Sequence, residues 1–352
     1  MRYLVRHRTD YRYDAPVFDS HNEVRLRPLD TGVQRLRRFA VTTTPRARLF
    51  AYRDWLGNTV HYFHVRGGHD RLTVVAESEV EVADPERRSG PGPTVGDFRR
   101  EAGALREQHH DFVVPSRRVP ALPEVARLAP SLAGRPDDEP LHDVAVEAME
   151  RTRGRLAYVP RATRVDTPLE HALDLRKGVC QDLAHLGVAI LRHMGIPGRY
   201  VSGYLRGPDP ESEEPPGSDS GQWHEGPGPD RGAGTGEPHP PDPDDPHAFP
   251  DAPDFHEEEP AHGVATRRRR PRLRASHAWV EAYLPGRGWV ALDPTHTRPI
   301  DTRYVKIAVG RDYDDVVPVK GIFRGKGKSR MRVHVDVIQL PESRPEAAEE
   351  PI

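Results

Sequence analysis

Apolar and polar residues alternate along much of the first 85 residues, which is the pattern of strands with one buried face. The alternation is clearest over residues 72–82, where even positions are apolar or small and odd positions mostly polar. Residues 54–58, with Gly57 and Asn58 at their centre, form a turn between two further strand candidates. We therefore expect an N-terminal β domain over residues 1–90, built as a small antiparallel sheet or sandwich.

The pattern changes to helical periodicity over residues 96–205. A helix start is predicted at 167–170, with Thr167 as the cap, and this helix should end near residues 177–178. The next helix should stop at Gly195, with a proline just beyond it, and residues 199–205 should form a strand. An earlier helix is indicated by apolar residues on one stripe: Leu141, Val144, Ala145, Ala148 and Met149.

Residues 206–274 differ in kind from what precedes them. They hold 15 of the 37 prolines together with many acidic residues. So little apolar content cannot offset the entropy of ordering a chain, so we predict a disordered insertion rich in proline, glycine and acidic residues. The arginine run at 267–270 could bind an anionic partner, but we favour a solvated charge block that balances the acidic stretch.

Alternating patterns return after the insertion. Residues 276–284 and 289–293 should form two strands joined by a tight Pro-Gly-Arg-Gly turn. Residues 331–337 alternate with apolar odd positions, and we expect them to form a strand of the same body. These patterns predict one core, with residues 96–205 as its helical half and residues 275–340 as its β half.

Composition limits the possible partners. The 352 residues carry a formal net charge of −2, which gives no overall attraction to nucleic acid. The first residues contain no long apolar segment of a signal peptide, and no apolar run reaches the ~18 residues of a membrane-spanning helix. We therefore expect a cytoplasmic protein without nucleic-acid or membrane partners, and the oligomeric state stays open.

The chain contains one cysteine, Cys180. A single thiol can form neither an intramolecular disulfide nor a thiolate metal cluster, so it is either a buried filler or a nucleophile. The sequence places it where a loop enters the first turn of a helix, and the helix dipole there favours a thiolate. The apolar face of that helix begins only at Leu183, which favours a helix tip at a cleft over a core position.

A nucleophilic cysteine needs an imidazole to move protons and a group that orients the imidazole. His277 and Asp293 are suitable candidates because the predicted hairpin turns near residues 286–287. That turn brings the region of His277 opposite residues 293–296, at the same end of the hairpin. Each residue taken alone has a plain structural explanation, and the arrangement of all three indicates a catalytic site.

These segments resemble the bacterial transglutaminase-like superfamily. The resemblance rests on three separated motifs that agree in order and spacing: residues 178–185, 276–281 and 288–295. Residues 11–28 resemble the N-terminal β domain that precedes this core in one bacterial subgroup, and residues 309–316 resemble its C-terminal segment. The resemblance covers nearly the whole chain outside the 206–274 insertion.

The resemblance implies an α+β fold with a papain-like core, in which a helix-tip cysteine packs on an antiparallel sheet. It implies Cys180 as nucleophile, His277 as general base and then acid, and Asp293 as the orienting carboxylate. The chain departs from the family pattern at His296, where such sequences usually have asparagine. The backbone N–H of Cys180 could serve the oxyanion. Further candidates for oxyanion or substrate contacts are Gln181, Tyr158 and Trp279.

The expected activity is acyl transfer from an amide or peptide bond through a thioester. The family resemblance favours hydrolysis, as in a peptidase or amidase, over transamidation by a transglutaminase. A catalytically silent peptide-binding module is a second alternative, and metal binding by Cys180 with scattered histidines is a third. No calcium-loop pattern occurs, so we expect neither a metal nor another cofactor. The expected partner is a peptide or protein amide substrate.

Overall fold

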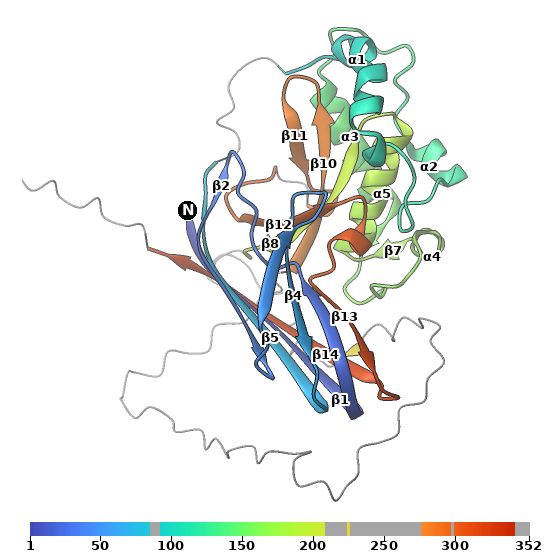
Figure 1. The fold of residues 1–352 in the computed structure, drawn as a ribbon. Helices are drawn as coiled ribbons and strands as arrows, with labels where there is room; N and C mark the ends of the chain where they lie inside the picture. Colours follow the sequence, from blue (N-terminus) through green and yellow to red (C-terminus); the bar gives the residue numbers. More distant parts are fainter. Residues whose placement is uncertain (85–91, 208–223, 226–275, 297–298, 342–352) are drawn as a thin grey trace, which may run out of the picture.

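The computed structural model describes residues 1–84, 92–207, 224–225, 276–296 and 299–341. Almost all of the predicted 206–274 insertion lies outside these residues. Two antiparallel sheets and a layer of helices make up the described part (Figure 1). Within it, no helix is long and apolar enough to cross a membrane.

The larger sheet is organised around one long strand, β1 (Arg2–Val24). The first half of β1 pairs with β5 (His69–Val82) and the second half with β4 (Thr59–Val65). Strand β2 (Gln34–Thr44) extends the sheet beyond β5, and β3 (Leu49–Arg53) pairs with β4. The predicted alternation and turn are both confirmed, because the even positions from 72 to 82 are buried and residues 54–58 connect β3 to β4.

The C-terminal strands complete this sheet, which corrects the expectation that they belong to the core. Strand β14 (Ser329–Leu340) pairs with the first half of β1, and β13 (Val319–Arg324) pairs with its second half. The two-residue β9 (His224–Glu225) lies on the outer edge of β14. Alternation identified 331–337 as a strand, but it cannot select the partner, because both sheets bury one apolar face.

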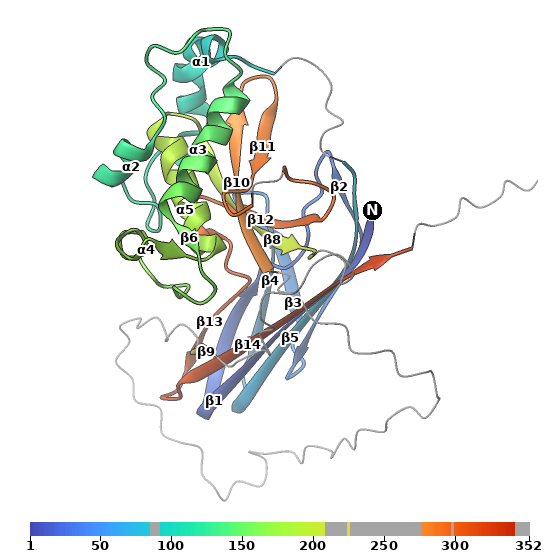
Figure 2. The ribbon, with the colours of Figure 1, turned by 180° about the vertical axis from the view of Figure 1, so that it is seen from behind.

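Five α-helices form the helical layer: α1 (Val95–Gln108), α2 (Pro123–Leu128), α3 (Leu141–Arg155), α4 (Leu169–Leu175) and α5 (Cys180–His193). Helix α5 is central and contacts α2, α3 and α4 (Figure 2). Two predicted details of α4 are wrong. The cap position is Pro168, whereas the hydroxyl of Thr167 accepts the N–H of Arg164 at 2.9 Å. The helix ends at Leu175, because Arg176 takes a left-handed conformation with φ of 53°.

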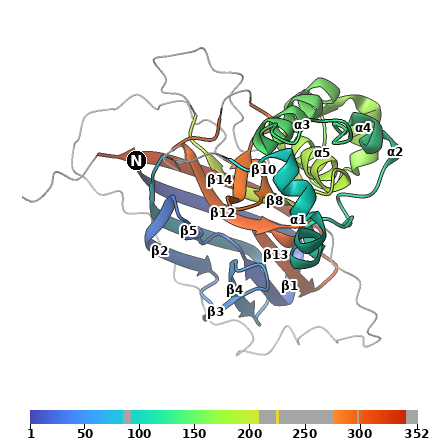
Figure 3. The ribbon, with the colours of Figure 1, turned by 90° about the horizontal axis from the view of Figure 1, so that it is seen from above.

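The core sheet has the strand order β11-β10-β8-β12. Its strands are β8 (Gly198–Leu205), β10 (Ser276–Leu284), β11 (Gly288–Leu292) and β12 (Tyr304–Gly310). Helix α5 packs on β8 and β10. Figure 3 shows the helices on one side of this sheet and the N-terminal strands on the other. Both faces of the core sheet are therefore covered.

Candidate active site

Cys180 is the first residue of α5 and is half-buried. The helix start is fixed by Asp182, whose buried carboxylate accepts the N–H of Val179 at 2.8 Å and the hydroxyl of Thr163. Gly178 permits this cap, because a Cβ there would lie 2.8 Å from the Cβ of Asp182. Burial raises the pKa of Asp182, although these two hydrogen bonds oppose the change. The prediction that the single thiol stands at a helix start is confirmed.

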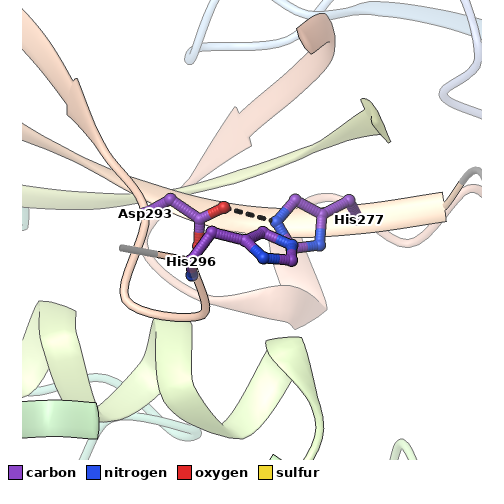
Figure 4. A group of neighbouring side chains, drawn as sticks. All are labelled: His277, Asp293 and His296. Atoms are coloured by element: carbon purple, nitrogen blue, oxygen red, sulfur yellow. Dashed lines mark hydrogen bonds and ion pairs between the residues drawn. The ribbon is translucent and has the colours of Figure 1, made fainter. Parts of the chain in front are cut away.

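The β10–β11 hairpin brings His277 and Asp293 together. Val280 pairs with Leu292, so Asp293 follows the last paired residue of β11 at the end of the hairpin where β10 begins. Nε2 of His277 lies 2.8 Å from Oδ2 of Asp293 (Figure 4). Both side chains are buried, with 7% of His277 and 0% of Asp293 exposed. Hairpin register was therefore sufficient to predict this contact.

Asp293 accepts further hydrogen bonds that hold it in its charged form. The hydroxyl of Tyr304, on β12, donates to Oδ2 at 2.8 Å, and the N–H of Thr295 donates to Oδ1 at 2.7 Å. Burial alone would raise the pKa of Asp293, but the hydrogen bond from His277 and these neighbours bring it below its usual range. Tyr304 carries no sequence signal of its role, because only the non-local pairing of β12 with β8 brings it here.

Cys180 lies close enough to His277 to act on the charge of its imidazole. Because Nε2 faces Asp293, Nδ1 is the ring nitrogen left for the thiol. Burial opposes a charge on this imidazole, but the hydrogen bond to Asp293, together with the negative charge of Asp293 and Cys180, raises its pKa to about 10. The arrangement therefore stabilises a protonated imidazole between a sulfur and a carboxylate, as cysteine-based acyl transfer requires.

Arg153 of α3 fastens the turn after β11 to the helical layer. Its Nη1 donates to the backbone carbonyl of Asp293 at 3.3 Å and to that of His296 at 3.1 Å. Arg153 belongs to the helical layer, which also contains α5. One guanidinium thus links the half of the core that holds Cys180 to the half that holds Asp293.

The candidates for oxyanion or substrate contacts differ in their exposure and in their hydrogen-bond partners. The side-chain amide of Gln181 is buried and donates to the carbonyl of Val165 at 3.0 Å. Tyr158 is exposed and pairs across a short parallel bridge with Gly178, two residues before the thiol. The backbone N–H of Cys180 is among the first N–H groups of α5, which have no carbonyl partner within the helix. The N–H of Cys180 is therefore available to an oxyanion, and Tyr158 is held near the start of α5 by its pairing with Gly178.

Trp279, the remaining candidate for a substrate contact, is buried. Its side chain is 1% exposed and meets the ring of Tyr304 edge-on, with 5.4 Å between ring centroids. Gly203 makes room for it, because a Cβ there would lie 2.5 Å from the indole. The sequence placed Trp279 on the face of His277 correctly, but Leu29 of the N-terminal part and residues of the core pack against it there.

His296 adds a second imidazole beside His277, with 5.3 Å between ring centroids. One ligand atom from each of His277, Asp293 and His296 lies within 4.8 Å of the others, so these residues could approach a metal ion (Figure 4). However, both carboxylate oxygens of Asp293 already accept hydrogen bonds. A cation would have to displace those donors, so the geometry fits an oriented imidazole better than a metal centre.

Comparison with known proteins identifies the class of this fold and site. Residues 3–81 match the bacterial transglutaminase-like N-terminal region, and residues 127–294 match the transglutaminase-like superfamily core. An uncharacterised protein of Mycobacterium leprae is 32% identical over 342 residues, which cover 96% of this chain and 99% of that protein. An uncharacterised protein of Mycobacterium tuberculosis is also 32% identical, over 350 residues that cover 96% of this chain and 92% of that protein. The chain belongs to the bacterial transglutaminase-like superfamily.

A solved structure supports the same fold. A candidate cysteine protease from Cytophaga hutchinsonii superposes with a TM-score of 0.61 at 18% identity, covering 97% of this chain and 92% of that chain. At this identity the likeness concerns the fold alone. It confirms the α+β class with a papain-like transglutaminase core and an N-terminal β domain. Cys180, His277 and Asp293 all lie within the matched core range.

Proposed function

We propose that this protein is a cysteine-dependent acyl-transfer enzyme that cleaves amide or peptide bonds. Cys180 is the nucleophile, His277 the proton carrier and Asp293 the orienting carboxylate. The observation that carries the proposal is the imidazole of His277, which hydrogen bonds with the buried carboxylate of Asp293 and lies near enough to Cys180 for the thiol to raise its pKa. Membership in a transglutaminase-like family, and a fold neighbour described as a candidate cysteine protease, support the same class of chemistry.

The reaction proceeds in two stages. The sulfur of Cys180 attacks the carbonyl carbon, and the resulting oxyanion is met by the backbone N–H of the helix start. The C–N bond breaks as His277 gives its proton to the leaving amine, and a thioester remains on Cys180. In the second stage neutral His277 takes a proton from water as its oxygen attacks the thioester. The carboxylic acid leaves, and the proton returns to the Cys180–His277 pair.

Hydrolysis is the favoured outcome of the second stage. An amine could attack the same thioester and give a new amide, which is transglutaminase chemistry. The fold neighbour described as a candidate cysteine protease supports hydrolysis. Asp293 has the same role in either case, because it holds the imidazole with Nε2 toward the carboxylate and Nδ1 toward sulfur.

A catalytically silent peptide-binding module is the rival function. A binding surface has no need of an imidazole held between a thiol and a buried carboxylate. Burying Asp293 completely costs free energy that only its hydrogen-bond donors offset. The contacts made by Asp293 therefore favour an enzyme.

Mass spectrometry of the intact protein tests the proposal. Purified protein is incubated with peptide amides or a cell extract, quenched in acid and compared with Cys180→Ala. An acyl adduct on Cys180, with release of free acid, is expected for hydrolysis. Transfer of the acyl group to an added primary amine would assign transamidation instead. Peptide retention without any adduct, equal in Cys180→Ala and wild type, would favour the silent module and contradict the proposal.

A further inference from the structure

A pocket of about 270 Å³ lies between the N-terminal strands and the core sheet, away from the candidate active site. Its N-terminal wall includes Arg27, from the segment after β1, and Arg53, the last residue of β3. Its other wall includes Arg199 of β8 and Lys306 of β12. Four basic side chains from four separate segments therefore converge on one cavity.

The charges around this pocket do not balance. Asp30 is the one acidic residue in its lining. Behind the wall, the buried carboxylate of Glu281 is shared by Arg199, at 2.7 Å, and by Lys306. The four positive charges thus face two negative ones. A surplus of positive charge that lines a partly enclosed site attracts anions.

The two arginines on the N-terminal side carry this surplus. Nη1 of Arg27 is 3.4 Å from the hydroxyl of Thr59, and Nη1 of Arg53 is 3.4 Å from the carbonyl of Gly57. Both are long contacts to neutral oxygens. Over the ranges that the structure describes, neither guanidinium forms an ion pair with a carboxylate. Arg27 is half-buried and Arg53 is exposed, so a ligand can reach both from solvent.

The other two basic groups are already oriented. Arg199 stacks on the ring of Trp289, with its guanidinium carbon 4.1 Å from the ring centroid. The backbone of Lys306 is held by Gln34, which accepts its N–H at 2.7 Å and donates to its carbonyl at 2.7 Å. These bonds join the N-terminal part to β12 directly beside the pocket. An anion bound here would bridge the same two parts of the molecule.

We propose that this pocket binds a small oxyanion with two negative charges, such as a phosphoryl group or a short dicarboxylate. Guanidinium groups present paired donors that match such oxygens, and lysine adds a compact charge. The site is distinct from the proposed acyl-transfer site. Glu281 lies four residues along β10 from His277, roughly 13 Å at the rise of a strand, and the buried Trp279 lies between them.

The test is calorimetric titration of the full-length protein with inorganic phosphate and, separately, with succinate, at ionic strength held constant with sodium chloride. Saturable binding of at least one anion is expected, and the preferred one identifies the chemistry of the ligand. In Arg27→Gln/Arg53→Gln the affinity should fall by at least about tenfold, because two charge-assisted contacts are lost. Arg38→Gln, an exposed arginine on β2, should bind as wild type does.

Arg53→Gln alone provides a second variant whose folding is not in question, because the side chain is exposed and its one side-chain hydrogen bond within the described residues is a long contact to the Gly57 carbonyl. It should weaken binding by about threefold. Absence of saturable binding of both anions to the wild type would overturn the proposal. Equal affinity in the wild type and the double variant would overturn it as well. Neither result depends on whether Cys180 is catalytic.

Discussion

Tyr304→Phe measures how far Asp293 depends on a residue outside its own hairpin. The change removes one hydroxyl, which donates at 2.8 Å to a carboxylate with 0% of its side chain exposed. Tyr304 itself is 4% exposed, so water cannot readily replace the lost donor. A hydrogen bond to a charged group contributes about 1.5–3 kcal/mol. We therefore expect the free energy of unfolding at pH 7 to fall by about 2 kcal/mol.

Tyr52→Phe is the matched control. Its hydroxyl donates to Glu23 at 2.7 Å, but Tyr52 is 45% exposed and water can take its place. Its loss should stay within about 0.5 kcal/mol in urea denaturation followed by fluorescence. Tyr304→Phe should also slow alkylation of Cys180, because His277 is then less firmly oriented. Equal stability losses in the two variants would show that burial does not strengthen the hydrogen bond from Tyr304 to Asp293.

Three further predictions concern the surroundings of the site. Gly203→Ala should lower the unfolding free energy by more than about 3 kcal/mol in urea denaturation, because its Cβ would lie 2.2 Å from the carbonyl of Val305; Gly67→Ala, with open space around it, should be neutral. Asp293→Asn should cost about 3 kcal/mol at pH 7. Because the pKa of Asp293 is lower in the folded protein than the value of about 3.9 in the unfolded chain, its charged form stabilises the fold at pH values above about 3.9. The difference in unfolding free energy between wild type and Asp293→Asn should therefore shrink as acid protonates the wild-type carboxylate. A difference that does not change with pH would contradict a stabilising charged contact. His296→Asn should leave alkylation of Cys180 unchanged, because the bond from residue 296 to Asp293 comes from its backbone N–H, which asparagine keeps; strongly slowed alkylation would give the ring a direct role.

The parts of the fold that depend on local pattern could be predicted from the sequence. The start of α5 at Cys180 followed from where the apolar helix face begins, and the closeness of His277 and Asp293 followed from a tight hairpin. Both inferences need only residues near one another in the chain. The 72–82 strand was found for the same reason.

The parts that depend on distant segments could not be predicted. Tyr304 reaches Asp293 because β12 pairs with β8, a contact between strands far apart in sequence. The burial of Trp279 depends in part on Leu29 of the N-terminal part, which alternation along β10 does not reveal. The pairing of β14 with β1 joins the two ends of the chain. In each case the contact joins segments that are far apart in the chain, and a local pattern does not reveal such a contact.

The proposed pairing of His277 with Cys180 should be visible in the rate at which Cys180 is alkylated at low pH. The pKa of His277 is raised to about 10, so its imidazole is protonated at pH 6 and favours a thiolate beside it. An ordinary thiol, with a pKa of about 8.5, is almost entirely protonated at that pH. Iodoacetamide should therefore modify wild-type Cys180 at pH 6 at least about tenfold faster than it modifies His277→Ala. The exposed His142→Ala should match wild type, and equal rates in wild type and His277→Ala would contradict the account.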